Sequence, residues 1–220
     1  MDAGRLLGAR ARSGAAASTR GQGIGGVNGL RRVALDAEHV VEVGAMPADL
    51  VPDAAGFAAL WDSHPGDYHE IMMHGRKVKT PRWQQAYGAD YRYTGNTNKA
   101  VPSTPQMQVW LAWARAGFDA RLNGLLLNWY DGAAGHYIGK HRDSEIQRVE
   151  GSPIVTLSFG EARVFRMRPW RGTGFMDIPV ANGSVLVIPW ATNRAFTHEV
   201  PASAAARGRR VSVTIRAFHM

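Results

Sequence analysis

Short apolar runs separated by turn-forming residues fill the second half of the chain, beyond Gly124. Turn segments such as DGAAG, RGTG and ANG lie between them, and no helical run intervenes. This succession predicts antiparallel strands arranged as a sandwich or jelly roll. The runs cover residues 125–130, 153–159, 162–167, 175–180, 184–189, 195–200 and 211–218.

Helical spacing of apolar residues marks two segments of the first half instead. One begins after Asp53, whose side chain can accept a hydrogen bond from a free N–H of a helix start, and it ends before Pro65. The other begins after Thr104, with Pro105 at its first position. Its apolar residues recur at i, i+3, i+4 and i+7, which is typical of a helix face packed on a core: Met107, Trp110, Leu111 and Ala114.

These patterns divide the chain into three regions. Residues 1–32 contain six arginines, one acidic residue and no apolar periodicity, so we expect a disordered basic leader. The leader is a basic arm for nucleic acid, an organellar transit peptide or an unstructured extension. Residues 33–123 carry the helices and residues 124–220 the β-rich core, and we expect 33–220 to form one structural unit.

The composition excludes several classes of protein. The 220 residues are 45% hydrophobic and 20% charged, which is typical of a folded domain. The absence of cysteine excludes disulfides, thiol nucleophiles and cysteine-ligated metals. No apolar run approaches the ~20 residues of a membrane span, so we expect no membrane partner. The net charge of +8 favours a polyanionic partner, although the leader contributes much of it.

The segment HRD supplies candidate metal ligands. On a strand, His141 and Asp143 would point to the same face, because residues i and i+2 do so. A third ligand must come from another strand, and His198 and His219 are the candidates. Two histidines and one carboxylate leave positions open for substrate and O₂ in non-haem Fe(II) oxygenases. A catalytic zinc site with the same ligands is the alternative.

The last strand predicts a site for a dicarboxylic acid. Arg210 and Arg216 lie six residues apart and therefore share a strand face with Ser212 and Thr214. Each guanidinium can bind a carboxylate through two hydrogen bonds. One carboxylate would pair with an arginine and the other would lie near the metal. Two arginines on a solvated strand face are the alternative.

These motifs together resemble the AlkB family of Fe(II)- and 2-oxoglutarate-dependent dioxygenases, closest to the branch of the duplex-DNA repair homologue. The resemblance runs from about Met72 to Phe218 and is carried by PRWQQAYG, YRYTG, NWYDGAAGHYIGKHRDSE, GSPIVTLSFG, THEVP and RRVSVTIR. It implies a mainly β double-stranded β-helix (a jelly roll) with an N-terminal α/β nucleotide-recognition lid over residues 33–123.

The resemblance also implies the roles of the residues in the core. The implied iron ligands are His141, Asp143 and His198. Arg210 matches the arginine that pairs with the distal carboxylate of 2-oxoglutarate, and Arg216 the arginine near its metal-bound end. The family commonly has Asn where this chain has Ser212. The full set of implied cofactor-binding residues is Asn128, Tyr130, Arg210, Ser212, Thr214 and Arg216.

Substrate residues follow from the same resemblance. Tyr91 and Tyr93 match lid aromatics that contact a flipped nucleotide, which would lie between Tyr93 and His141. Glu145 matches an acidic residue that reads an exocyclic amine. The homologue has an apolar finger ending in Phe-Gly; here Met73 and His74 are the candidate wedge residues. A neighbouring basic cluster is expected to contact phosphates: Arg76, Lys77, Lys79 and Arg82.

The resemblance therefore implies an enzyme that uses Fe(II), 2-oxoglutarate and O₂ to demethylate N-alkylated bases such as 1-methyladenine and 3-methylcytosine in DNA or RNA. Formaldehyde, succinate and CO₂ would be released. The positive charge of such a base would attract it to Asp143 and Glu145. A hydroxylase or demethylase of a protein, lipid or small molecule is one alternative, and a non-catalytic β-sandwich binding module is another. We expect a monomer in the cytoplasm, with organellar targeting by the leader as the alternative.

Overall fold

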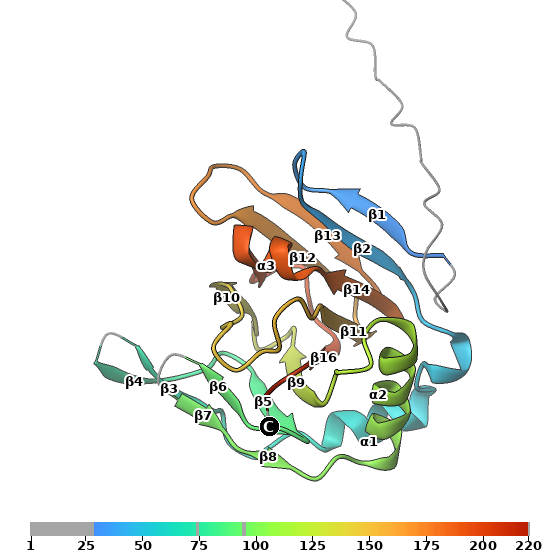
Figure 1. The fold of residues 1–220 in the computed structure, drawn as a ribbon. Helices are drawn as coiled ribbons and strands as arrows, with labels where there is room; N and C mark the ends of the chain where they lie inside the picture. The colour runs from blue at the N-terminus through green and yellow to red at the C-terminus, as the bar shows by residue number, and fades with distance from the viewer. Residues whose placement is uncertain (1–28, 74, 94–95, 220) are drawn as a thin grey trace, which may run out of the picture.

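A computed structural model describes residues 29–73, 75–93 and 96–219, and its main element is an eight-stranded sheet (Figure 1). All neighbouring strands in this sheet are antiparallel except one pair at its edge. In spatial order the strands are β1 (Arg31–Ala34), β2 (Val40–Ala45), β14 (Ser184–Ile188), β11 (Ile154–Gly160), β16 (Arg209–Arg216), β9 (Gly124–Asp131), β5 (Trp83–Tyr87) and β8 (Ala100–Val101).

A second sheet of four strands packs against one face of the first. Its order is β10 (Ile138–His141), β15 (Phe196–Val200), β12 (Arg163–Pro169) and β13 (Met176–Val180). A buried apolar cluster joins the two sheets, with Ile154 and Leu186 from the large sheet and Phe165 and Ile178 from the small one. Two facing antiparallel sheets confirm the expected jelly roll.

The helices α1 (Ala54–Asp62) and α2 (Pro105–Gly117) cover the other face of the large sheet. Both helix starts are as expected. The Asp53 side chain accepts a hydrogen bond from the Gly56 N–H at 2.7 Å. That of Thr104 accepts one from the Met107 N–H at 3.3 Å. The apolar stripe of α2 is buried in the same cluster as Leu127 and Val213.

Two hairpins lie outside both sheets, on the side away from α2 (Figure 1). One is formed by β3 (Glu70–Met73) and β4 (Arg76–Lys79), the other by β6 (Tyr91–Tyr93) and β7 (Asn96–Asn98). His74 lies outside the described residues, as does the side chain of Met73, so the two candidate wedge residues stay a prediction.

The structure corrects two expectations about the chain path. Arg31 and Arg32 belong to β1 and pair with Val43 and Glu42, so these two residues are not disordered; the expected leader up to residue 28 lies outside the described residues. A short helix, α3 (Trp190–Ala195), interrupts the β-rich half, where only strands were expected. The remaining short element is the 3-10 helix η1 (Ala48–Leu50). Within the described ranges, no helix is long and apolar enough to cross a membrane.

Strand β16 has two faces with opposite character. Val211, Val213 and Ile215 point into the core beneath the helices. The alternate residues line a cavity of about 510 Å³ between the sheets: Arg210, Ser212, Thr214 and Arg216. The register against β9 places Arg210 opposite Tyr130 and Ser212 opposite Asn128, which line the same cavity. The expected alternation therefore builds one wall of a site.

Candidate active site

Three side chains from two sequence regions converge beside this cavity, which His141 and His198 line and Asp143 does not. His141, Asp143 and His198 each offer one ligand atom, and these atoms lie within 4.8 Å of one another. The Nε2 atoms of His141 and His198 are 3.8 and 3.9 Å from the same carboxylate oxygen, Oδ1 of Asp143. No other group of three or more such residues occurs in the described part of the chain. The structure thus selects His198 and leaves His219 out.

Their backbone setting differs from the expected strand. Strand β10 ends at His141, so Asp143 lies in the loop that follows. His141 and His198 sit directly opposite each other where β10 pairs with β15. The Nδ1–H of His141 donates to the Gly139 carbonyl at 2.8 Å, which leaves its Nε2 free to bind a metal.

The protonation states suit a divalent cation. Burial would raise the pKa of Asp143, but the adjacent Arg216 and the two imidazoles outweigh it and hold this pKa below its usual value. Burial, together with the neighbouring His141, lowers the pKa of His198 to about 3. Burial also lowers the pKa of His141. A carboxylate and two neutral imidazoles are the forms that bind metal, so the residues fit the Fe(II) expected from the sequence.

Helix α3 fixes the loop that carries Asp143. The Asn193 side chain accepts a hydrogen bond from the Asp143 N–H at 3.2 Å and donates one to its carbonyl at 3.0 Å. Both residues are buried. The Arg194 carbonyl accepts a hydrogen bond from Arg142 at 2.8 Å. No sequence signal indicates these contacts, because they join residues 50 and 52 positions apart through a helix too short for apolar periodicity.

The cofactor wall has buried donors without protein partners. Arg210 is 1% exposed, and its Nη2 donates to Ser158 Oγ at 3.0 Å. Its Nε and Nη1 are buried and unpartnered among the described residues. Buried guanidinium donors need an acceptor, and a carboxylate matches their geometry. These orphan donors fit the distal carboxylate of 2-oxoglutarate.

The second arginine lies at the metal end of the same wall. Nε of Arg216 donates to Oδ2 of Asp143 at 2.5 Å, and its Nη1 is buried with no hydrogen-bond partner in the part of the chain that the structure describes. Oδ2 is thereby occupied, and Oδ1 faces the two histidines. Arg216 therefore orients the carboxylate and keeps one donor for a ligand beside the metal.

The expected substrate residues fall into different places. Tyr93 lines the cavity together with His141. Tyr91 also lines it but is 8% exposed, and its hydroxyl donates to Asp143 Oδ1 at 3.3 Å. Burial and the Asp143 charge raise the pKa of Tyr91, which keeps this hydroxyl protonated. Tyr91 thus faces the metal ligands more than an incoming base.

The expected phosphate contact of Arg82 is not what the structure shows. Arg82 is 7% exposed and lies in the cavity wall, where it donates to Asn128 and Gln84. Arg76, Lys77 and Lys79 are exposed on β4, as a phosphate-binding role requires. The clustering of cationic residues in a sequence does not indicate which of them is buried, so it does not separate Arg82 from the other three.

The expected attraction of a cationic base to two carboxylates is also not supported. Glu145 is not among the residues that line the cavity, and its carboxylate lies 3.5 Å from Nε of Arg194. Asp143 is buried and forms an ion pair with Arg216. The described cavity lining contains no acidic residue and six basic ones: Lys79, Arg82, Lys140, Arg142, Arg210 and Arg216. The wall is therefore suited to anions.

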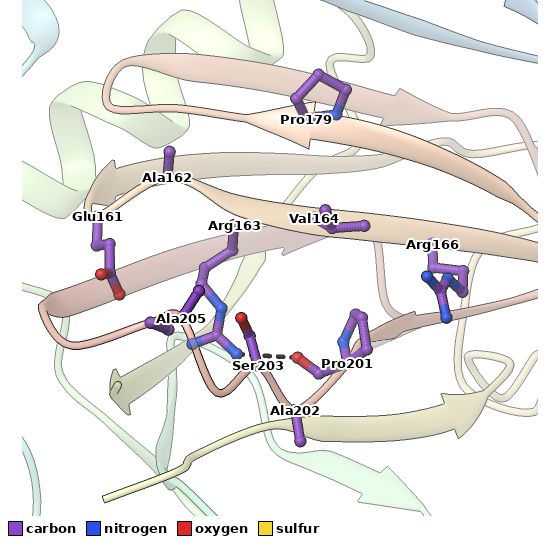
Figure 2. Close-up of a pocket in the computed structure, with 11 residues that line it drawn as sticks. Glu161, Ala162, Arg163, Val164, Arg166, Pro179, Pro201, Ala202, Ser203 and Ala205 are labelled. Carbon is purple, nitrogen blue, oxygen red and sulfur yellow. Dashed lines mark hydrogen bonds between the residues drawn. The ribbon is translucent and has the colours of Figure 1, made fainter. Parts of the chain in front are cut away.

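A second cavity, of about 480 Å³, lies beside the turn between β11 and β12 (Figure 2). Figure 2 shows Arg163 reaching from β12 to the Pro201 carbonyl, to which it donates at 2.9 Å. Oε1 of Glu161 accepts hydrogen bonds from the N–H groups of Arg207 and Gly208, both at 2.9 Å. These bonds fix the loop that leads into β16, and so support the strand that carries both cofactor-wall arginines.

Comparison with known proteins agrees with this site. The sequence matches the 2OG-Fe(II) oxygenase superfamily over residues 57–216. It is similar to DNA oxidative demethylase ALKBH2 of Homo sapiens, with 28% identity over 198 residues, covering 85% of this chain and 75% of the human protein. The Mus musculus protein of the same name is 28% identical over 201 residues, covering 85% and 82%. A solved structure titled "The structure of OsALKBH1" has a TM-score of 0.53 at 15% identity, over 84% of this chain and 99% of that chain.

These findings confirm the resemblance to the AlkB family and the need for Fe(II), 2-oxoglutarate and O₂. They also confirm an enzyme rather than a binding module. Because the superfamily match spans most of the sequence and contains all three candidate ligands, the chain belongs to the 2OG-Fe(II) oxygenase superfamily.

Proposed function

We propose that this enzyme oxidatively demethylates N-alkylated bases in DNA, with 1-methyladenine and 3-methylcytosine as its substrates. The observation that carries the proposal is that two of the three clustered metal ligands, His141 and His198, line one cavity together with two buried arginines. The ALKBH2 relatives, named as DNA oxidative demethylases, support DNA as the substrate.

The residues of the chain have distinct tasks in this reaction. His141, Asp143 and His198 would hold Fe(II), and Arg210 would bind the distal carboxylate of 2-oxoglutarate. Bound iron and 2-oxoglutarate supply the oxidation of an N-methyl C–H bond by O₂, with succinate, CO₂ and formaldehyde as products. Arg216 keeps Asp143 ionised and oriented, and the enclosing sheets limit the access of water.

The basic rim supports a nucleic acid substrate. Lys79 and Lys140 are exposed where they line the cavity entrance, and Arg142 lies between two of the metal ligands in sequence. Cations at these positions would bind the phosphates on either side of an extruded base. The base itself would enter beside Tyr93 and the metal site.

The test is formaldehyde release from a panel of oligonucleotides, each with one 1-methyladenine, 3-methylcytosine or 3-methylthymine, in single-stranded DNA, duplex DNA and RNA. We expect release from the methylated DNAs, dependent on Fe(II) and 2-oxoglutarate and absent in the His141→Ala variant. No release from any DNA, in a protein that still binds metal and 2-oxoglutarate, would overturn the proposal. 3-Methylthymine is neutral, so formaldehyde release from it, compared with release from the two cationic bases, measures how far the positively charged cavity wall disfavours a cationic base.

A further inference from the structure

A chain of hydrogen bonds crosses the cavity wall from the cofactor side to the substrate side. Nε of Arg82 donates to Oδ1 of Asn128 at 2.7 Å, and its Nη2 donates to Oε1 of Gln84 at 2.8 Å. Nε2 of Gln84 then donates to the hydroxyl of Tyr93. All four side chains line the cavity. Among the described residues, no carboxylate lies within 4 Å of Arg82. Its guanidinium therefore interacts with these two amide oxygens instead of with a counter-ion.

The direction of these bonds is set by chemistry. A guanidinium has only donors, so each amide must turn its oxygen toward Arg82 and its NH₂ group away. The NH₂ of Asn128 is then left for a partner in the cavity. The NH₂ of Gln84 meets the Tyr93 oxygen, which accepts. Burial raises the pKa of Tyr93, so the hydroxyl stays protonated and its own proton has to be donated elsewhere.

We propose that Arg82 is a positioning residue that sets the hydrogen-bond polarity of the whole cavity wall, so that Asn128 and Tyr93 both present donors to their ligands. At the cofactor end of the wall, the NH₂ group of Asn128 then donates to a carboxylate. The Tyr93 end receives an acceptor atom of the substrate, a ring nitrogen or carbonyl oxygen of the base, in preference to an N–H group. This inference rests on the proposed function and names the chemical group that Tyr93 recognises.

The variant Gln84→Glu reverses the bond at Tyr93 with almost no change of shape. A glutamate still accepts a hydrogen bond from Arg82, but it has no N–H group. The Tyr93 hydroxyl must therefore donate to the glutamate, and it can no longer donate to a ligand in the cavity. Tyr93→Phe removes the hydroxyl and keeps the ring. Gln108→Glu, on the exposed face of α2, is the control for the added charge.

The assay is fluorescence anisotropy of labelled single-stranded DNA with the protein loaded with Mn(II) and 2-oxoglutarate without O₂, so that binding is measured without turnover. The quantity compared is the Kd for unmodified DNA divided by the Kd for the same DNA with one 1-methyladenine. We expect Gln84→Glu and Tyr93→Phe each to lower this ratio about tenfold, the size of one buried hydrogen bond. The double variant should lose no more than either single one, and Gln108→Glu should match the wild type.

The cofactor end has its own measurement. Calorimetric titration of 2-oxoglutarate into the Mn(II) protein should show weaker binding in Arg82→Met, while Gln84→Glu and Tyr93→Phe keep the wild-type affinity. A wild-type ratio in either Gln84→Glu or Tyr93→Phe, or additive losses in the double variant, overturns the inference. If the wild type itself neither prefers methylated DNA nor releases formaldehyde, the proposed function fails instead.

Discussion

The clamp between Asn193 and the backbone of Asp143 can be tested by removing it. Asn193→Ala deletes both hydrogen bonds to this loop and leaves the N–H and the carbonyl of a metal ligand buried without partners. Each unsatisfied buried group costs about 1–3 kcal/mol. Water admitted to the space left by the amide would satisfy one of the two, so we expect the free energy of unfolding to fall by about 2–3 kcal/mol.

The same change should weaken metal binding, because a less restrained backbone at Asp143 lets its carboxylate move relative to the two histidine ligands. Loss of such supporting contacts typically lowers metal affinity about 10- to 100-fold. Urea unfolding of the metal-free protein measures the first effect, and competition for Fe(II) with a chelator under anaerobic conditions measures the second.

Thr192→Val is the matched control on the same helix. It removes one partly buried hydrogen bond, from Thr192 Oγ1 to the Val40 carbonyl at 2.8 Å, that does not involve the Asp143 loop. We expect a stability loss of about 1 kcal/mol and unchanged metal affinity. If Asn193→Ala binds Fe(II) as the wild type does, or loses no more stability than Thr192→Val, α3 does not position the ligand loop.

Three further outcomes are expected. His141→Ala and Asp143→Ala should each abolish formaldehyde release and Fe(II) binding, and wild-type-like turnover in either would remove the iron assignment. Arg210→Met should raise the KM for 2-oxoglutarate at least ~100-fold, since a charged acceptor loses its buried donors, and an unchanged KM would contradict the cofactor wall. His136 has a pKa lowered by burial, and its neutral ring accepts from the Asp131 N–H and bonds Tyr68. Below its ordinary pKa of 6.5 the unfolded chain binds a proton that the folded chain does not, so stability should fall as pH drops through this range, by up to ~1.4 kcal/mol per pH unit. Urea midpoints measured from pH 7.5 to 5 should show a shallower slope in His136→Asn, and an equal slope would refute the assignment.

Local rules were sufficient where one element carried its own signal. The two helix starts followed from Asp53 and Thr104, each of which accepts the expected hydrogen bond. The alternation of β16 placed Arg210 and Arg216 on one face, and the antiparallel register then set them beside β9. The sequence alone leaves His198 and His219 as candidates, and the pairing of β10 with β15 places His198 opposite His141.

Contacts between distant elements could not be read from the chain. Arg82 stood in a run of exposed cations, yet its side chain turns inward, because a partner 46 residues away accepts its hydrogen bond. Glu145 follows the metal ligands closely but pairs with Arg194 instead of entering the cavity. Six residues are enough for α3 but too few for a periodic pattern, so its support of Asp143 had no counterpart in the sequence.

The separation of the β3–β4 hairpin from both large sheets has an evolutionary consequence. Its four pairs are all internal, from Glu70 with Lys79 to Met73 with Arg76, so no ladder of the catalytic core depends on them. Insertions, deletions or exchanges in this segment would change what is admitted to the cavity and leave the iron ligands in register. Diversification of substrate choice can therefore proceed here at little risk to the chemistry, and chimaeras that exchange residues 70–79 between relatives would make this separability visible.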